Sequence, residues 1–394
     1  MENNNDNKVL NVPHLRFPEF SGEWKKCKLG DLCNVLMCKR ILVSQTNTED
    51  GVPFYKIGTI GSTPDAYISK ELFDDYKVKY NYPRKGEVMI TCAGTVGKCV
   101  VYDGEDAYFQ DSNIVWIDNP TQYISNGFLF HLLSKVDWRK LNSTTIIRIY
   151  NDDLRNLKMS YPRKEEQQKI SHLLSLLDER IATQNKIIYK LKSLIRGIMV
   201  ELQKRGLSNG TWKKVLLSNV LTERNELNKS LYPVYSVSVI QGIVNQMEYL
   251  GRSFAASDTS KYHVVHYGDL VYTKSPTGSF PYGIIKQSYN QNEVAVSPLY
   301  GVYEPKTFST GVFLHEYFKS ELNTLNYLHP LVQKGAKNTI NIANQRFLES
   351  YVAIPSNANE LLAISKLLCS LNTKLEFLQN ILKQSQGQKQ YLLR

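Results

Sequence analysis

Residues 22–32 read Gly-Glu-Trp24-Lys25-Lys26-Cys-Lys-Leu29-Gly-Asp-Leu32, and this stretch returns 188 residues later as Gly210-Thr-Trp212-Lys213-Lys214-Val-Leu-Leu217-Ser-Asn-Val220. A second segment repeats in the same way. Lys79-Tyr80, followed by Gly86-Glu87-Val88, returns as Lys261-Tyr262, followed by Gly268-Asp269-Leu270. A period near half the chain length is too long for one unit of a solenoid. The chain of 394 residues therefore contains two copies of one domain.

The positive charge of the chain is shared by both copies. Residues 1–207 hold 30 Lys and Arg against 25 Asp and Glu, a balance of +5, and residues 208–394 hold 18 against 12, a balance of +6. The sum is +11, and the pI is about 9.1. A basic excess on two folded domains indicates a polyanion partner, with nucleic acid as the first candidate. A basic protein without such a partner stays open as the alternative.

Cysteine spacing and hydropathy argue against a metal site and a membrane. The six cysteines form no Cys-x-x-Cys pair, and no histidine follows Cys27, Cys33 and Cys38 at zinc-finger spacing. The first residues, Met1-Glu-Asn-Asn-Asn-Asp, are polar and acidic, unlike a signal peptide. No apolar run approaches the roughly 18 residues of a membrane helix. We expect a reduced, cytoplasmic protein with no metal and no membrane partner.

Two long heptad patterns follow the two copies. Apolar residues at alternating four- and three-residue spacing indicate coiled-coil helices, each with one seam. The first seam consists of Ile170, Leu174, Leu177, Ile181, Gln184, Ile188, Leu191, Ile195 and Ile198. The second, at an offset of 194 residues, consists of Ile364, Leu368, Leu371, Leu375, Leu378 and Leu382. Ser385 and Lys389 then stand where the first seam has leucine and isoleucine, so the last turns should fray or need a partner.

An apolar stripe must be covered in water, and two stripes in one chain most simply cover each other. The domain between the helices returns the chain to its start, which favours an antiparallel pair. A helix of roughly 36 residues is about 54 Å long, which matches roughly 16 base pairs of DNA. The helices would then act as a ruler between two readers. A homodimerising coiled coil stays open, and polar Gln184 either fixes the register or is a tolerated defect.

The sequence thus predicts an α+β protein with an internal pseudo-two-fold repeat. Two similar mixed α/β domains are separated by two long antiparallel coiled-coil helices. The predicted segments are a disordered N-terminus at 1–12, the first domain at 13–160, the first spacer helix at 161–207, the second domain at 208–355 and the second spacer helix at 356–394.

No motif for catalysis is present. Gly94-Thr-Val-Gly97-Lys98 is too short for a phosphate-binding loop, and cysteine follows the lysine. Asp118-Asn-Pro120 is followed by Thr rather than by the second proline of an amino-methyltransferase motif. Neither a nucleophile elbow nor a His-Glu-x-x-His pair occurs. We therefore assign no catalytic residue.

DNA recognition needs cations for phosphates and amide, hydroxyl or guanidinium groups for base edges. Residues of these types gather at equivalent places in both copies, and we predict that they contact DNA. In the first copy they are Lys77, Lys79, Tyr80, Tyr82, Arg84, Lys85, Thr91, Thr95, Lys98, Gln110, Ser112, Asn113, Arg148, Tyr150 and Asn151. In the second they are Lys261, Tyr262, His263, Thr273, Lys274, Ser275, Lys334, Lys337, Asn338, Asn341 and Asn344.

The whole chain resembles the specificity subunits of type I restriction–modification enzymes. The resemblance is carried by Pro13-His-Leu-Arg16-Phe17-Pro-Glu-Phe20, Trp24-Lys-Lys, Leu29-Gly-Asp-Leu32, Gly94-Thr-Val-Gly97-Lys98, Gln110-Asp-Ser-Asn-Ile114, Pro162-Arg-Lys-Glu-Glu-Gln167-Gln168-Lys-Ile170 and Leu177-Asp178-Glu179-Arg180-Ile181. The second copy departs from the pattern, because Pro355-Ser356-Asn-Ala-Asn-Glu360 lacks the Glu-Glu-Gln-Gln start.

The resemblance implies two target-recognition domains, each reading one half of an interrupted site in double-stranded DNA. It also implies that the helices dock two modification subunits, which use S-adenosylmethionine to methylate adenine at N6. Restriction subunits would add ATP- and Mg²⁺-dependent translocation and cleavage. The chain itself would be non-catalytic and hold no cofactor. Two other readings remain: a protein-binding scaffold built on the coiled coil, and a free-standing nuclease or methyltransferase.

Overall fold

The computed structural model describes residues 11–141, 148–252, 254–334 and 340–393. The predicted disordered segment 1–12 therefore lies almost entirely outside the described residues. The chain forms two compact units: unit 1 comprises residues 1–183 and 383–394, and unit 2 comprises residues 184–382. Each unit includes a part of both long helices.

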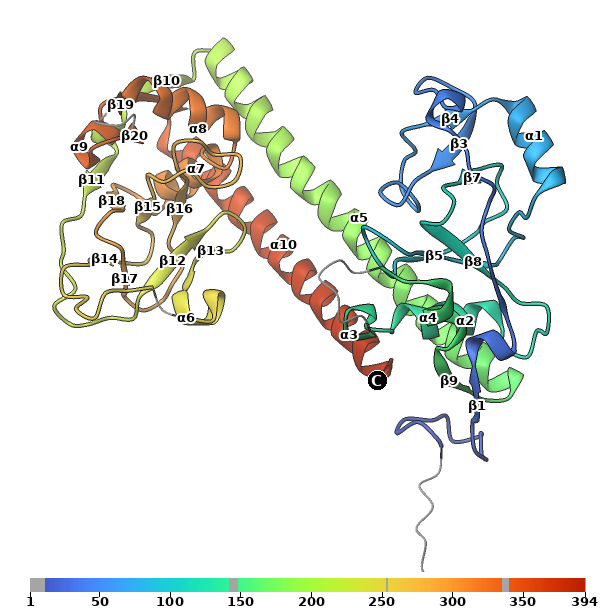
Figure 1. The fold of residues 1–394 in the computed structure, drawn as a ribbon. Helices are drawn as coiled ribbons and strands as arrows, with labels where there is room; N and C mark the ends of the chain where they lie inside the picture. Colours follow the sequence, from blue (N-terminus) through green and yellow to red (C-terminus); the bar gives the residue numbers. More distant parts are fainter. Residues whose placement is uncertain (1–10, 142–147, 253, 335–339, 394) are drawn as a thin grey trace, which may run out of the picture. The chain divides into compact units, whose positions relative to one another are not determined.

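Unit 1 is built on a four-stranded antiparallel sheet in the order β2-β8-β5-β6. Its central strands, β5 and β8, are labelled in Figure 1. The central strands are apolar and buried, as expected for strands covered on both faces. The strands of unit 1 are β1 (Lys25–Lys28), β2 (Asn34–Leu36), β3 (Val52–Tyr55), β4 (Tyr67–Ile68), β5 (Val88–Thr91), β6 (Cys99–Val101), β7 (Tyr108–Phe109), β8 (Ile114–Asp118) and β9 (Lys158–Tyr161).

Short helices cover this sheet, and a smaller sheet in the order β4-β3-β7 lies beside it. The helices are η1 (Leu29–Asp31), η2 (Val43–Gln45), α1 (Lys70–Lys79), α2 (Asn126–Ser134), α3 (Trp138–Leu141) and α4 (Asn151–Arg155). Two apolar cores result. One lies under α2 around Phe128 and Leu129, and the other lies under α1 around Phe73 and Trp116.

Unit 2 repeats the main sheet as β11-β18-β15-β16, again antiparallel. Its strands are β10 (Trp212–Leu216), β11 (Leu221–Glu223), β12 (Tyr235–Ser238), β13 (Gly242–Asn245), β14 (His263–Val265), β15 (Leu270–Tyr272), β16 (Ile285–Gln287), β17 (Val294–Val296), β18 (Gly301–Pro305), β19 (Gln333–Lys334), β20 (Ile340–Asn341) and β21 (Tyr351–Pro355). Its short helices are η3 (Leu217–Asn219), α6 (Gln246–Leu250), α7 (Phe308–Tyr317), α8 (Glu321–Leu328), η4 (His329–Leu331) and α9 (Asn344–Phe347).

The repeat seen in the sequence is therefore a repeat of structure. In each unit the strand that contains the two lysines of the Trp-Lys-Lys motif pairs with the strand just before a long helix, β1 with β9 and β10 with β21. The units differ beside the main sheet. Unit 2 has the pairs β12-β13 and β14-β17 where unit 1 has β4-β3-β7 and α1. The predicted fold class, two similar mixed domains with two long helices, is confirmed.

The two long helices are α5 (Lys164–Ser208, 45 residues) and α10 (Ala358–Leu392, 35 residues). Every residue of the two predicted seams is buried or half-buried. Within unit 2 the helices run antiparallel, because Ile195 shares a core with Ile364 and Leu368, whereas Gln184 donates a 2.9 Å hydrogen bond to the Leu378 carbonyl. The pairing of both helices in one chain makes the homodimerising alternative unnecessary to cover the seams.

Of the two expected outcomes for the end of α10, fraying or pairing with a partner, the structure shows the second. The helix continues to Leu392, and Ser385 is 4% exposed although it breaks the apolar pattern. Within unit 1, the Lys389 ammonium pairs with the Asp178 carboxylate of α5. A buried serine and a cross-helix ion pair thus stand where the first seam has apolar residues.

Candidate nucleic-acid interface

The main sheet of each unit carries a loop that is closed in the same way. In unit 1 the loop after β5 begins at Thr91, whose N–H donates to the Lys98 carbonyl at 3.0 Å and whose hydroxyl accepts the Lys98 N–H at 3.0 Å. In unit 2 the loop after β15 begins at Thr273, which makes the same two contacts with Ile284, each at 3.1 Å. Both threonines are buried. Their hydroxyls hold the loops closed, and a direct contact with DNA would require them to leave this pairing.

In unit 1 the structure brings three predicted segments together at this loop. The Cys92 N–H donates to the Asn113 carbonyl at 2.8 Å, and the Cys92 carbonyl accepts the Ile149 N–H at 2.9 Å. The Arg148 guanidinium donates to the Ser112 carbonyl at 3.3 Å. The loop after β5, residues 110–113 and residues 148–151 therefore form one surface, which we name the loop face of unit 1.

The loop face presents groups suited to a nucleic acid. Thr95 is exposed at the tip of the loop, and Tyr150 is 62% exposed with the Arg148 guanidinium 5.9 Å from its ring centre. An exposed tyrosine ring beside a guanidinium can contact a sugar or a base. Gln110 and Asn151 lie half-buried at its margin. Lys98 belongs to the loop, but its ammonium donates to the Ile60 carbonyl at 2.5 Å. This contact fastens the loop to the segment between β3 and β4.

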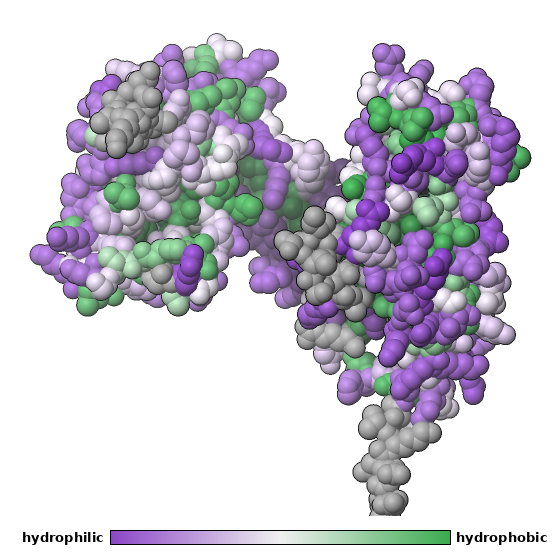
Figure 2. Space-filling model, viewed as in Figure 1, coloured by the Kyte–Doolittle hydropathy of each residue, from purple (hydrophilic) through white to green (hydrophobic). Residues whose placement is uncertain are grey.

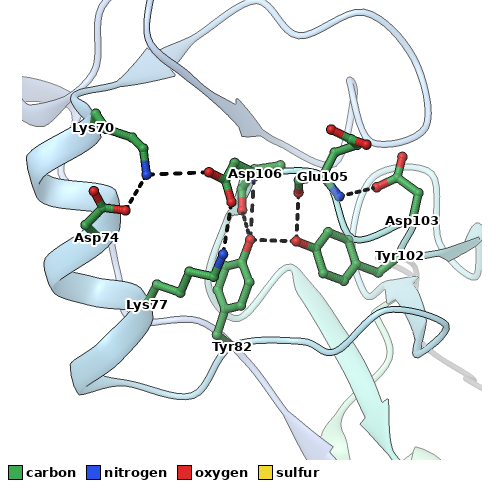
Figure 3. A network of polar contacts seen from close by, with 9 residues as sticks. Lys70, Asp74, Lys77, Tyr82, Tyr102, Asp103, Glu105 and Asp106 are labelled. Atoms are coloured by element: carbon green, nitrogen blue, oxygen red, sulfur yellow. Dashed lines mark hydrogen bonds and ion pairs between the residues drawn. The ribbon is translucent and has the colours of Figure 1, made fainter.

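A second group of predicted residues belongs to a polar network that holds α1 in place (Figure 3). The Lys77 ammonium lies 2.9 Å from the Asp106 carboxylate and lowers the pKa of Asp106. The Tyr82 hydroxyl donates to the Ala107 carbonyl at 2.7 Å and lies 2.8 Å from the Tyr102 hydroxyl. Burial and the Tyr102 contact raise the pKa of Tyr82. These side chains satisfy one another inside unit 1.

The remaining predicted residues of unit 1 lie near α1 or at the far end of β5. Lys79 pairs with Asp75 on α1, and Tyr80 ends that helix at 41% exposed. Arg84 pairs with the buried Glu87, and exposed Lys85 follows it. Residues 84 and 85 precede β5, whereas the loop face begins where β5 ends. The predicted DNA residues of unit 1 therefore do not form a single surface.

In unit 2 the equivalent loop face contains Lys274 and Asn344. The Asn344 amide donates to the Glu223 carboxylate at 2.7 Å, and the same carboxylate attracts the Lys274 ammonium. Burial nevertheless lowers the pKa of Lys274. Asn344 is the first residue of α9, as Asn151 is the first residue of α4, so the two units place an asparagine at the same position. Ser275 is exposed on the loop.

The other predicted residues of unit 2 occupy the start of β14 and the β19-β20 hairpin. The His263 Nδ1 atom lies 3.1 Å from the Tyr300 carbonyl, next to the start of β18, and exposed Lys261 precedes it. The Tyr262 hydroxyl accepts the Ala256 N–H at 3.0 Å. Lys334 and Asn341 lie on β19 and β20, with only their backbone described. Lys337 and Asn338 lie outside the described residues.

Two tethers between domain and helix were not predicted as contacts. In unit 1 the Trp24 indole donates to the Glu166 carboxylate at 3.3 Å, and Arg16 pairs with the same carboxylate at 2.7 Å. In unit 2 the Trp212 indole donates to the Glu360 carboxylate at 2.8 Å. The missing Glu-Glu-Gln-Gln start therefore does not remove this link, because Glu360 takes the position of Glu166. The repeated tryptophan was the signal that could have found it.

A buried polar cluster where α7 meets α10 in unit 2 was also missed. The Glu316 carboxylate accepts from the Asn372 amide at 2.8 Å and from the Lys319 ammonium at 2.5 Å. His315 is buried and accepts the Gln287 N–H at 2.7 Å, and desolvation holds its pKa well below the ordinary value. Lys286 is 6% exposed, and desolvation lowers its pKa to about 8. From the sequence alone, a lysine in the middle of a strand is expected to lie on the surface.

Neither a metal centre nor a membrane helix is found in the part of the chain that the structure describes. Three cysteines that lie close together in the sequence, Cys27, Cys33 and Cys38, are free thiols there. Burial raises the pKa of Cys33 and of Cys38 to about 12. On each unit, the visible surface in Figure 2 is mostly hydrophilic with smaller apolar patches.

Comparison with known proteins identifies the class of domain. Residues 21–193 match the family model described as the type I restriction modification DNA specificity domain. This part of the chain is therefore similar to that family, and the resemblance predicted from the sequence is confirmed for these residues.

Individual relatives agree with this assignment. A putative type I restriction enzyme specificity subunit of Haemophilus influenzae is 47% identical over 172 residues, 44% of this chain and 42% of that protein. The putative MjaX specificity subunit of Methanocaldococcus jannaschii is 24% identical over 213 residues, 50% of either chain. The matches thus span about half the length of these relatives. The crystal structure of the S subunit of a type I restriction–modification system from M. genitalium has the same fold, with a TM-score of 0.61 at 15% identity over 94% of this chain and 95% of that one.

Proposed function

We propose that this chain is the DNA sequence-specificity subunit of a type I restriction–modification complex. Each unit reads one half of an interrupted site in double-stranded DNA through its loop face. The observation that carries the proposal is the duplication of the clamped loop at the same end of the same four-stranded sheet, within a chain that holds a specificity domain. Two readers on one chain suit a site in two parts.

The long helices have two roles in this proposal. They fix the spacing of the two readers, because a paired helix is stiff and has a constant rise of about 1.5 Å per residue. They also dock two modification subunits. Leucine and isoleucine side chains on the solvent side of α5 support this role: Leu173, Leu176, Ile187 and Leu194 are each between 37% and 52% exposed. An exposed apolar row on a helix that is already paired is available to a protein partner.

In this proposal the partner subunits, and not this chain, catalyse the reactions of the complex. The modification subunits would use S-adenosylmethionine to methylate adenine at N6, and restriction subunits would use ATP and Mg²⁺ for cleavage. The specificity chain would bind DNA without catalysing a reaction and would need no cofactor of its own.

The test is adenine-methylation mapping of DNA from cells that express this chain with the modification subunit of its own system. We expect one interrupted motif. Exchange of residues 13–160 for another recognition domain should change one half of that motif, and exchange of residues 211–354 should change the other. A soluble complex that methylates no defined motif would refute the proposal and leave the coiled coil as the functional part. In that scaffold reading, affinity for DNA would depend little on salt, whereas phosphate contacts make it fall steeply.

A further inference from the structure

The two clamped loops end, as well as begin, in the same way. Residue 97 and residue 283 are glycines with φ of 82° and 96°, and each directly precedes the residue that pairs with the clamp threonine. A Cβ atom on Gly97 would lie 2.1 Å from the Trp138 ring, and one on Gly283 would lie 2.7 Å from the Lys274 nitrogen. Both the backbone conformation and the close approach require glycine. A buried threonine and a left-handed glycine thus frame each loop.

The segments inside this frame differ in length and shape. Unit 1 holds five residues, 92–96, folded closely: the Thr91 hydroxyl donates to the Thr95 carbonyl. Unit 2 holds nine residues, 274–282. There Thr277 and Phe280 exchange two backbone hydrogen bonds of 3.0 Å, and the Phe280 ring is buried beneath them. The longer segment is therefore a small hairpin whose Phe280 side chain is buried. Its exposed residues are Ser275, Pro276, Gly278, Ser279 and Pro281.

The composition of both segments suits the surface of a duplex. Neither segment contains Asp or Glu, although the Ser279 hydroxyl of the longer segment donates to the Glu321 carboxylate of α8. Hydroxyl groups can donate to or accept from any base edge. The Thr277 hydroxyl is fixed on the Ser275 carbonyl at 3.0 Å. A loop held in one shape before binding loses less conformational entropy on contact with DNA.

We propose that the threonine–glycine frame presents interchangeable reading loops, and that residues 274–282 determine the bases recognised by unit 2. The corresponding loop in unit 1 is residues 92–96. Because the two loops differ by four residues, the two units recognise unlike half-sites even though their sheets are the same. This inference rests on the proposed function and adds to it the segment that sets specificity.

The test replaces residues 274–282 with Cys-Ala-Gly-Thr-Val, the sequence of residues 92–96, in the full chain assembled with its modification subunit. Methylation mapping should show a changed half-site for unit 2, with the other half and the spacing unchanged. The control is the double variant Gln291→Ala, Asn292→Ala. These exposed residues lie in the loop after β16, at the opposite end of that strand from the clamp, and the variant should keep the site.

Variants of the clamp test the same inference without replacing the loop. Thr273→Val removes the acceptor for the Ile284 N–H, and Thr273→Ser keeps it. In the valine variant, discrimination against single mismatches in the half-site of unit 2 should fall about tenfold, and serine should restore it. Discrimination in the other half should not change, which a general loss of folding would not produce.

The outcomes separate the inference from the proposed function. A wild-type complex with no interrupted motif would overturn both. A wild-type complex with such a motif, together with a loop exchange that leaves both half-sites as they were, would overturn the loop assignment alone. If the exchanged chain failed to assemble, the Thr273 pair would decide, because equal discrimination by valine and serine variants would contradict the inference.

Discussion

At the scale of single residues, polar groups at the base of each long helix link it to a domain. Trp24 with Glu166 and Trp212 with Glu360 are the same contact made twice, although the tryptophans are 188 residues apart and the glutamates 194. The position of the acceptor is therefore retained while the chain between the two partners changes length. Such a contact fixes the direction in which the helix leaves the domain.

Removal of the second tether should destabilise unit 2. Glu360→Leu leaves the Trp212 indole N–H without an acceptor in a buried place, which we expect to lower the free energy of unfolding by about 2 kcal/mol. Glu360→Gln retains a carbonyl acceptor and should recover more than half of this loss. Urea unfolding followed by tryptophan fluorescence measures both. Equal stability of the leucine and glutamine variants would show that the hydrogen bond contributes nothing.

Lys286 predicts a dependence of stability on pH. The unfolded chain keeps this lysine protonated up to its ordinary pKa of about 10.4, whereas in the folded chain its pKa is about 8. Between these values the unfolded state binds more protons, so stability rises with pH across the window. Lys286→Met removes the cost of the buried charge. It should raise the free energy of unfolding by about 3 kcal/mol at pH 7, with a gain that shrinks from pH 8 towards pH 10.4.

Urea unfolding of both proteins at several pH values between 7 and 10 measures this effect. Lys306→Met is the matched control, because Lys306 is exposed in the same unit, and it should change stability by no more than about 0.5 kcal/mol. A constant difference between wild type and Lys286→Met across this range would contradict the assigned cause.

Residue type says less about where a side chain lies than position in the repeat does. Thr91, Thr273 and Tyr82 have the chemistry of DNA ligands, but their side chains are committed inside the protein. A motif gives the type of a residue and its neighbours in sequence, not the direction of its side chain. The repeat, by contrast, puts Thr91 and Thr273 at equivalent positions, because matching Gly-Glu87-Val88 with Gly-Asp269-Leu270 also aligns β5 with β15.

At the scale of elements, the long helices were the most predictable part of the chain. Their heptads are long and lack proline, so the period of apolar residues alone identifies both the helix and its buried side. The exception was the end of α10. A pattern of apolar residues could not anticipate that Lys389 finds Asp178 across the pair, because that contact depends on the register of one helix against the other.

Gln184 tests whether that register is specified. Its amide donates to the Leu378 carbonyl in the observed alignment of the helices. Gln184→Leu should raise the melting temperature, because a half-buried amide becomes apolar, and should broaden the spacer lengths accepted in the methylated motif. Thr183→Leu introduces a leucine at the adjacent exposed position and should leave a single spacer length in the methylated motif. A single unchanged spacer in the Gln184 variant would mean that the polar position is only tolerated.

At the scale of the whole molecule, the chain uses one framework twice and varies what the framework holds. The order β2-β8-β5-β6 matches β11-β18-β15-β16, and the Trp–Glu tether and the loop clamp recur. The elements beside the sheet and the loop inside the clamp do not recur. Under the proposed function, this division would let specificity change in one half without loss of the fold, the pairing of the helices or the other half. The sequence displays the shared framework directly, whereas the bases that the proposed reading loops would recognise depend on contacts that no repeat encodes.

The proposed role of the paired helices also predicts the spacing between the two half-sites. Four residues inserted into each seam, close to one helical turn, lengthen each helix by about 6 Å, which corresponds to nearly two base pairs. If the helices set the distance between the readers, the methylated motif should keep both half-sites and gain up to about two unread base pairs between them. Four residues inserted between Asn209 and Gly210, after the end of α5 and outside the seams, serve as the control and should leave the spacer unchanged. The same spacer in the wild type and in the seam variant would refute the helices as the ruler, because the readers would then be positioned by the modification subunits or by the DNA itself.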